Sequence, residues 1–112
     1  MNKREELIVK YAADLKDKFG IEADMDLLTK IAIGLGPSIY NPDSSTVSSS
    51  DALELERVKT NFLIKKLGLS DGPSLDEAIA SVIEQYGRTN RNKYRVVVYY
   101  LLTKHFGKEA TY

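Results

Sequence analysis

The sequence predicts an all-α protein, a single compact bundle of about five helices. Three observations carry this prediction. Five segments place apolar residues three and four positions apart, the spacing of one helix face, and each segment is followed by a glycine. The chain has 112 residues, which is the length of one domain with one core. Its 43% hydrophobic and 29% charged residues are typical of a folded globular protein. We therefore treat residues 1–112 as one helical domain.

The first two helices are predicted at about residues 3–19 and 25–35. Gly20 can end the first in the left-handed conformation that only glycine adopts without steric cost. Pro37, after Gly36, stops the second, because proline cannot continue the ladder of backbone hydrogen bonds. We expect the acidic residues near 24 to cap the second helix, since a calcium loop needs ligands spread over about 12 residues with a glycine at its turn.

Residues 37–50 are the one long irregular stretch. We expect Ile39, Tyr40 and Val47 to anchor it to the body of the protein. The part from about 41 to 50, named here the serine-rich loop, is expected to be flexible. Its composition suits a plain linker, a phosphorylation target or a partner-binding loop equally well.

The third helix is predicted from about 51 to 67, with Leu55, Val58, Phe62 and Leu63 facing inward and a glycine cap at 68. The fourth is predicted to begin at a capping box, in which the Ser74 oxygen and the Glu77 side chain each satisfy a free backbone amide. Its inward positions are 75, 78, 79, 82, 83 and 86, and a glycine at 87 ends it.

The fifth helix is predicted from about 91 to 106, with Asn90 or Asn92 as its cap and an inward stripe at positions 94, 97, 98, 101 and 105. Its β-branched and aromatic run would also suit a buried strand, but its length favours a helix. A helix that is apolar nearly all round is either the centre of the bundle or shares a face with a second subunit. In the second case the outer face would be Val96, Tyr99 and Tyr100, a candidate surface for self-association.

Shifting the chain by 48 residues aligns several helix positions and the Lys-x-Gly sequences at 18–20 and 66–68. The bundle could therefore consist of two similar helical hairpins followed by a buried C-terminal helix. Two helix-glycine-helix units also share such features through composition alone, and we favour that simpler explanation.

Composition excludes several kinds of site. The chain has no cysteine and one histidine, His105, so a disulfide framework, a thiolate nucleophile and an imidazole-rich metal site are excluded. We predict no metal, no cofactor and no catalytic residue. The longest apolar run has seven residues, 96–102, whereas a membrane span needs about 20. With no signal peptide in view, we expect a cytoplasmic protein without a membrane partner.

Charge is unevenly distributed although the net charge is zero. Residues 1–84 hold ten basic and fifteen acidic side chains, whereas residues 85–108 hold six basic side chains and no acid. Within the second segment, Arg88, Arg91, Lys93 and Arg95 precede the fifth helix and form a candidate anion-binding turn. The asymmetry also fits a C-terminal segment that packs against the acidic remainder, and we favour this explanation.

Four longer sequence segments carry a resemblance to a known family: DLLTK (26–30), GPSIYN (36–41), NFLIKKLG (61–68) and RNKYRVVVYYLLTKHFG (91–107). Together they resemble a family of small bacterial proteins catalogued as domain of unknown function 2853. The resemblance spans almost the whole chain. It implies a bacterial cytoplasmic origin and a compact helical domain, and it brings no activity, cofactor or partner.

The leading functional hypothesis is a non-enzymatic interaction or accessory module, with an unknown protein partner or self-association. The alternative is binding of nucleic acid or another polyanion through residues 88–95. Catalysis ranks third. His105 falls on the predicted inward stripe without a partner that would tune it, so we interpret it as a packed histidine near a helix end rather than a general acid or base.

Overall fold

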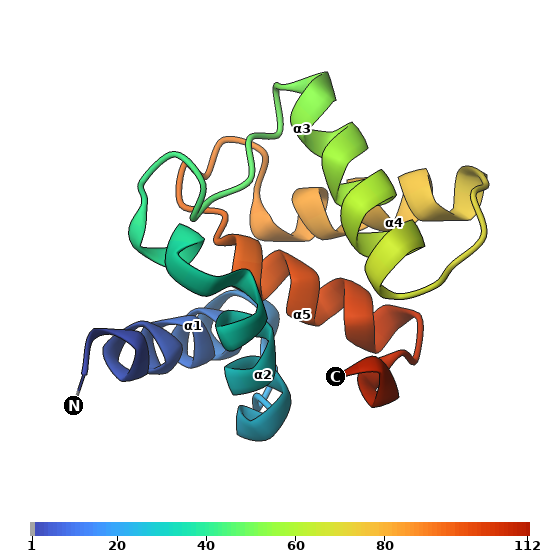
Figure 1. Cartoon of the computed structure of the whole chain (residues 1–112). Coiled ribbons are helices and arrows are strands. Elements are labelled where there is room, and N and C mark those ends of the chain that lie inside the picture. Colours follow the sequence, from blue (N-terminus) through green and yellow to red (C-terminus); the bar gives the residue numbers. More distant parts are fainter. Residues whose placement is uncertain (1) are drawn as a thin grey trace.

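The computed structural model describes residues 2–112. Figure 1 shows this part of the chain as helices packed around one central helix. The elements in order are α1 (Lys3–Phe19), α2 (Met25–Leu35), the 3₁₀ turn η1 (Gly36–Tyr40), α3 (Ala52–Arg57), the π-helix η2 (Val58–Lys66), α4 (Pro73–Tyr86), α5 (Arg95–His105) and the 3₁₀ turn η3 (Glu109–Thr111). The predicted all-α bundle of about five helices is confirmed.

The first two helices have the predicted bounds. Asn2 caps α1 by accepting the backbone N–H of Glu5 on its side-chain oxygen. Gly20 ends the helix with a φ of 65°, in the left-handed region. Asp24 caps α2, since its carboxylate accepts the backbone N–H of Asp26 at 3.1 Å. The predicted capping role of the acidic residues near 24 is confirmed for Asp24.

The serine-rich loop leads from η1 to α3. Ile39 and Val47 are buried, as predicted, but Tyr40 is 42% exposed, so its predicted role as an anchor is wrong. Successive side chains on a 3₁₀ turn point about 120° apart, and with Ile39 inward its neighbour faces solvent. Further along, Thr46 forms an isolated antiparallel bridge with Tyr94, ahead of α5. The flexibility of the loop stays a prediction.

The predicted third helix is one helical segment with two windings, α3 followed by η2. The predicted inward residues Val58, Phe62 and Leu63 are buried, and Leu55 is half-buried. Gly68 follows with a φ of 74°. The π winding was not predicted, because apolar residues at positions 58, 62 and 63 share a face in either kind of helix.

Pro73, rather than a capping box, begins α4. The N-cap residue is Gly72, and no side chain caps the first turn, so the capping box predicted at Ser74 and Glu77 is wrong. Proline is pre-set for the first helical position and has no N–H that needs a partner. The helix therefore starts two residues earlier than the predicted cap at Ser74 implies, and it takes Ser74 into its first turn. All six predicted inward positions of α4 are buried.

The fifth helix, α5, is the centre of the molecule. It begins at Arg95, later than predicted, after an extended Tyr94. Neither predicted asparagine caps it. Instead, the side-chain oxygen of Asn90 accepts the backbone N–H of Asn92 in the turn before the helix. Every residue from 96 to 103 is buried within the chain, which identifies α5 as the central helix rather than a face shared with a second subunit.

Two helix pairs flank α5 (Figure 1). α1 packs against α2, η2 packs against α4, and α5 contacts α1, α2 and α4. This is the arrangement of two hairpins and a buried C-terminal helix that the sequence suggested, with shared composition still the favoured explanation of their similarity. Within residues 2–112, no helix combines the length and apolar character needed to cross a bilayer.

Candidate functional site

Two adjoining depressions meet at Arg88, and together they form the candidate site. The first, named here the α3–α4 groove, has a volume of about 250 Å³. It is lined by Ala52, Leu55, Glu56, Asp76, Ile79, Ala80, Ile83 and Arg88. The second, named here the serine–arginine hollow, also measures about 250 Å³. It is lined by Thr46, Val47, Ser48, Ser49, Ser50, Arg88, Thr89, Asn90, Arg91 and Lys93.

The α3–α4 groove exists because α3 buries none of its side chains. Its six residues include no buried position, and Leu53 is 67% exposed, more than any other large hydrophobic side chain in the described part of the chain. The opposite wall is α4, whose buried Ile79 and Ile83 form an apolar floor. In Figure 1, α3 rises away from the body of the molecule at its N-terminal end. An apolar surface is therefore left open between the two helices.

Opposite charges mark the two ends of the α3–α4 groove. Asp76 lies in the first turn of α4, and Arg88 lies two residues beyond the last residue of this helix. The Lys59 ammonium contacts Asp76 at 3.2 Å, which places the start of η2 beside the first turn of α4. At the other end, the Ser49 hydroxyl donates to the Arg88 carbonyl at 3.0 Å. Glu56 and Asp76 consequently form an acidic end of the groove, and Arg88 forms a basic end.

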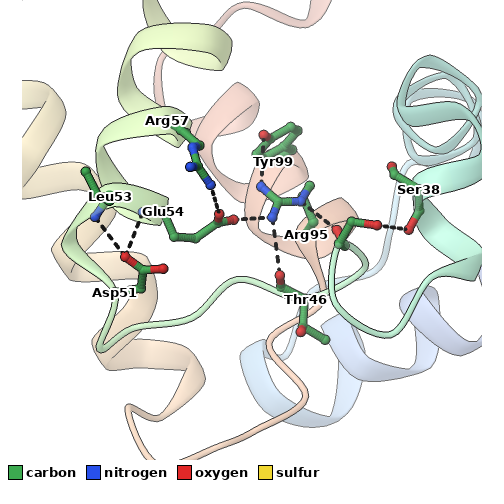
Figure 2. Close-up of polar contacts among 9 residues, drawn as sticks. Ser38, Thr46, Asp51, Leu53, Glu54, Arg57, Arg95 and Tyr99 are labelled. Carbon is green, nitrogen blue, oxygen red and sulfur yellow. Dashed lines mark hydrogen bonds and ion pairs between the residues drawn. The ribbon is translucent and has the colours of Figure 1, made fainter.

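Arg95 holds α3 and the serine-rich loop against α5, as Figure 2 shows. Its guanidinium donates to the Glu54 carboxylate, to the Ser44 carbonyl at 2.8 Å, to the Thr46 carbonyl at 3.3 Å and to the Tyr99 hydroxyl at 3.3 Å. The Arg95 and Glu54 side chains are each 13% exposed. The structure therefore places Arg95 in an internal ion pair and not on an anion-binding surface.

This ion pair also accounts for part of the charge asymmetry in the sequence. Arg95 belongs to the basic C-terminal segment and Glu54 to the acidic remainder. Their contact is an example of the expected packing of the basic C-terminal segment against the acidic remainder. Arg88 uses its Nε atom in a similar way, on the exposed Glu84 carboxylate four residues earlier. Arg91 is exposed and has no hydrogen bond or ion pair among residues 2–112.

Within the candidate anion-binding turn, the Lys93 side chain is unexpectedly buried, since it is only 3% exposed. Its ammonium donates to the Arg88 carbonyl at 3.0 Å and to the Asn90 carbonyl. Burial, followed by repulsion from the Arg88 charge, lowers its pKa. No carboxylate forms an ion pair with it in the part of the chain that the structure describes. Lys93 is therefore buried within the turn, and its part in anion binding stays a prediction.

The predicted self-association face is also internal. Val96 and Tyr100 are each 1% exposed, and Tyr99 is 8% exposed. Tyr99 stacks on Phe62 with ring centroids 3.8 Å apart. The Tyr100 hydroxyl accepts the backbone N–H of Asp24 at 2.8 Å. The expectation that Val96, Tyr99 and Tyr100 form an outer face is wrong, because neighbouring helices of the same chain cover them.

His105 is exposed at the last residue of α5, and its ring meets the Phe106 ring edge-on at 4.8 Å. The predicted inward position of His105 is therefore wrong. The helix emerges from the core after Thr103, and the next two side chains, Lys104 and His105, are exposed.

Sequence reasoning missed the α3–α4 groove and the role of the serine residues. Leu53 and Leu55 are two positions apart and cannot share one face of a helix, and this spacing was a signal that one of the two stays outside the core. Nothing in the sequence indicated that Ser48, Ser49 and Ser50 would line the serine–arginine hollow. Its position depends on contacts across about 40 residues of sequence, such as that between Ser49 and Arg88.

Comparison with known proteins agrees with the sequence resemblance. No curated protein matches the chain. A family model described as "Protein of unknown function (DUF2853)" matches residues 10–110, nearly the whole chain and every α-helix in full or in large part. The chain therefore belongs to the DUF2853 family.

Proposed function

We propose that this protein is a non-enzymatic interaction module that binds an amphipathic helical segment of a partner protein in the α3–α4 groove. The observation that carries the proposal is a helix, α3, with no buried side chain beside the apolar floor formed by Ile79 and Ile83. Helix-in-groove recognition places apolar side chains of a partner helix, spaced three and four apart, on such a floor.

The charges at the ends of the groove define the occupant. A partner helix with an acidic residue near its N-terminus and a basic residue near its C-terminus matches its own dipole. In the groove, its acidic end would lie beside Arg88 and its basic end beside Glu56 and Asp76. The partner helix would then run antiparallel to α4. Such charge complementarity fixes direction and register more than it adds affinity.

The volume of the groove supports the side chains of a peptide rather than a drug-sized organic ligand. Pockets for organic ligands measure about 300–1,000 Å³, and the α3–α4 groove, at about 250 Å³, is smaller. It suits two or three apolar side chains from one face of a helix, while the remaining contacts form along its rims.

A second apolar depression, lined by Arg4, Ala32, Ile33, Gly36, Pro37 and Tyr40, is the competing surface. Its exposed Tyr40 ring has the Lys3 ammonium 5.6 Å from its centroid. Arg4 is the one charged residue in its lining, so it offers no pair of opposite charges to orient a helix. We therefore favour the α3–α4 groove.

Nucleic-acid binding, the alternative function, is supported less well by this geometry. Two of its four expected contact residues, Lys93 and Arg95, use their charged groups inside the chain. Binding to single-stranded nucleic acid relies on a basic groove with several phosphate contacts and stacked aromatic side chains. Arg88 and Arg91 alone give a much smaller basic surface.

A labelled synthetic helix tests the proposed function. The peptide would have about 14 residues, the length of α4, with leucines on one face, Glu near its N-terminus and Lys near its C-terminus. Fluorescence anisotropy would measure its dissociation constant. We expect Ala80→Arg to weaken binding about tenfold or more, because the exposed Ala80 lines the groove and a bulky charge there blocks the floor.

Ala110→Arg is the matched control, because Ala110 is also exposed but lies in η3, away from the groove. It adds the same charge and should leave the dissociation constant unchanged. A peptide with the same composition and a scrambled apolar face should not bind. Equal affinity for the native protein and the Ala80→Arg variant would contradict the proposed function.

A further inference from the structure

The serine–arginine hollow has positive charge on one wall and hydroxyl groups on the other. Arg88, Arg91 and Lys93 come from the turn before α5, and the serine-rich loop supplies the opposite wall. None of the ten lining residues is acidic. Glu84 offsets part of the Arg88 charge from outside the hollow, through the Nε atom only. The Arg91 guanidinium has no partner among residues 2–112 and is available to a ligand.

The buried Lys93 charge is the second, independent observation. Buried charged groups are normally paired with an opposite charge, because the loss of hydration is costly. Lys93 is 3% exposed, and its ammonium contacts two backbone carbonyl oxygens but forms no ion pair within the described residues. Carbonyl dipoles solvate the ammonium without neutralising it. An anion in the hollow would supply the missing negative charge.

The hydroxyl wall can complete the coordination of a tetrahedral oxyanion. The Ser48 and Ser50 hydroxyl oxygens are 3.3 Å apart and share one hydrogen bond. A hydroxyl group has one proton and two acceptor lone pairs, so this pair keeps one proton to donate to a ligand oxygen. The Ser49 hydroxyl is already used on the Arg88 carbonyl and fixes the distance between the two walls.

From this arrangement we propose that the serine–arginine hollow binds a phosphate dianion, either free or as the monoester of a small molecule. Arg91 and the outer nitrogens of Arg88 bind phosphate oxygens, since a guanidinium matches that geometry with two parallel hydrogen bonds. The volume of about 250 Å³ leaves room for a short substituent. Two arginines facing one hollow suit a single phosphate group better than an extended polyanion.

Inorganic phosphate is the first probe. A ¹⁵N-HSQC titration of the full chain with phosphate, against chloride at matched ionic strength, should shift the amides of residues 48–50 and 88–91 with saturation. Arg91→Gln removes one exposed charge from the hollow and should weaken binding about tenfold, as expected for the loss of a charge-assisted contact. Lys65→Gln is the control, because Lys65 is exposed on η2 and does not line the hollow.

A second variant, Lys93→Met, keeps most of the buried side-chain volume and removes the charge. It should fold and lose the phosphate-dependent shifts. If it fails to fold, Arg91→Gln still decides the question, because Arg91 makes no contact that the fold needs. The inference is overturned if chloride gives the same shifts as phosphate, or if Arg91→Gln and Lys65→Gln weaken binding equally.

Two further probes distinguish the source of the phosphate. Phosphoserine, a monoester, should bind at least as well as inorganic phosphate and shift the same amides. A short single-stranded oligonucleotide, which has only diester phosphates, should bind more weakly. Tighter oligonucleotide binding, with shifts that extend along α5 to Lys104 and beyond its end to Lys108, would overturn the inference in favour of a nucleic-acid surface.

Discussion

A single guanidinium group, that of Arg95, connects three parts of the chain. It contacts the serine-rich loop through two carbonyl groups, α3 through Glu54 and its own helix through Tyr99 (Figure 2). Because α3 buries no side chain of its own, this ion pair is a main attachment between the first turn of α3 and the core. The α3–α4 groove therefore depends on Arg95 for its shape.

Replacing Arg95 with alanine should lower the free energy of unfolding by about 3 kcal/mol, the effect of breaking a largely buried ion pair and leaving one charge unpaired. Urea denaturation followed by circular dichroism measures the change. The matched control is Arg91→Ala, which removes an exposed arginine without a partner in the described chain and should change stability by less than about 0.5 kcal/mol.

A double-mutant cycle with Glu54→Ala isolates the pair itself. Once Arg95 is gone, loss of Glu54 should cost much less than it does in the native protein, because no buried cation remains unpaired. Strictly additive effects of the two substitutions would show that Arg95 stabilises the fold through its carbonyl and Tyr99 contacts and not through Glu54.

Two tyrosines, the buried Tyr11 and the half-buried Tyr112, make stability sensitive to alkaline pH. Burial, with the neighbouring tyrosines, raises the pKa of Tyr11 from 10.0 to about 12. Burial, followed by Tyr99, raises the pKa of Tyr112 to about 12 as well. Well below pH 10 both phenols are neutral in the folded and unfolded states. Between pH 10 and 12 the unfolded chain releases these protons first, so the free energy of unfolding should fall.

Urea denaturation at intervals from about pH 9 to about pH 12 checks this dependence. The Tyr11→Phe variant, which cannot ionise at position 11, should lose less stability over that interval than the native protein. If both proteins lose stability equally, Tyr11 does not contribute to the alkaline transition.

At the residue scale, the sequence identifies charge but not its partner. The basic turn was recognisable from Arg88 to Arg95, yet Lys93 and Arg95 are directed inward. Their partners are two nearby carbonyl groups and a carboxylate 41 residues earlier. Long side chains reach either solvent or an internal acceptor from the same backbone position, and only the packed fold decides between the two.

At the element scale, the helices follow from short-range chemistry that a sequence displays. Apolar spacing, capping side chains and glycines predicted α1 and α2 to the residue. The start of α4 was shifted because Pro73 favours the first helical position more strongly than Ser74 favours the cap. The π-helix η2 could not be predicted, since its apolar positions also suit an α-helix.

Two glycines in the first hairpin should respond to alanine with opposite signs. Gly20 has a φ of 65°, where an alanine side chain is strained, so Gly20→Ala should destabilise the protein by about 1 kcal/mol. Gly34 lies inside α2, and an added methyl group would meet only the Tyr112 ring at an ordinary contact distance of 3.8 Å. Gly34→Ala should therefore stabilise by about 0.5–1 kcal/mol.

Thermal or urea denaturation of the two variants in parallel measures this contrast. Because both substitutions add one methyl group to the same helical hairpin, a difference in sign reports on backbone conformation rather than on hydrophobicity. Destabilisation by Gly34→Ala would indicate that Tyr112 packs against α2 too closely to admit the methyl group.

At the scale of the whole molecule, the central position of α5 was one of two outcomes that its composition allowed. A helix that is apolar on all sides has to be covered, but its sequence does not say whether the cover comes from the same chain. Here α1, α2 and α4 surround it, so the expected self-association face is used inside the monomer. The open apolar surface lies elsewhere, between α3 and α4.

The α3–α4 groove and the serine–arginine hollow are two distinct depressions that lie next to each other. Arg88 lines both the α3–α4 groove and the serine–arginine hollow. A partner helix in the groove would lie with its acidic end beside the hollow. Neither depression could be located from the sequence, because each is built from segments that are about 25 to 40 residues apart.

Intermolecular nuclear Overhauser effects between the synthetic amphipathic peptide and the methyl groups of the protein test the central claim most directly. The groove predicts contacts from the peptide leucine methyls to Leu55, Ile79 and Ile83, with the glutamate end of the peptide beside Arg88. Contacts to Ile33 and Tyr40 instead, or no contacts to the α3–α4 groove at saturating peptide, would contradict it.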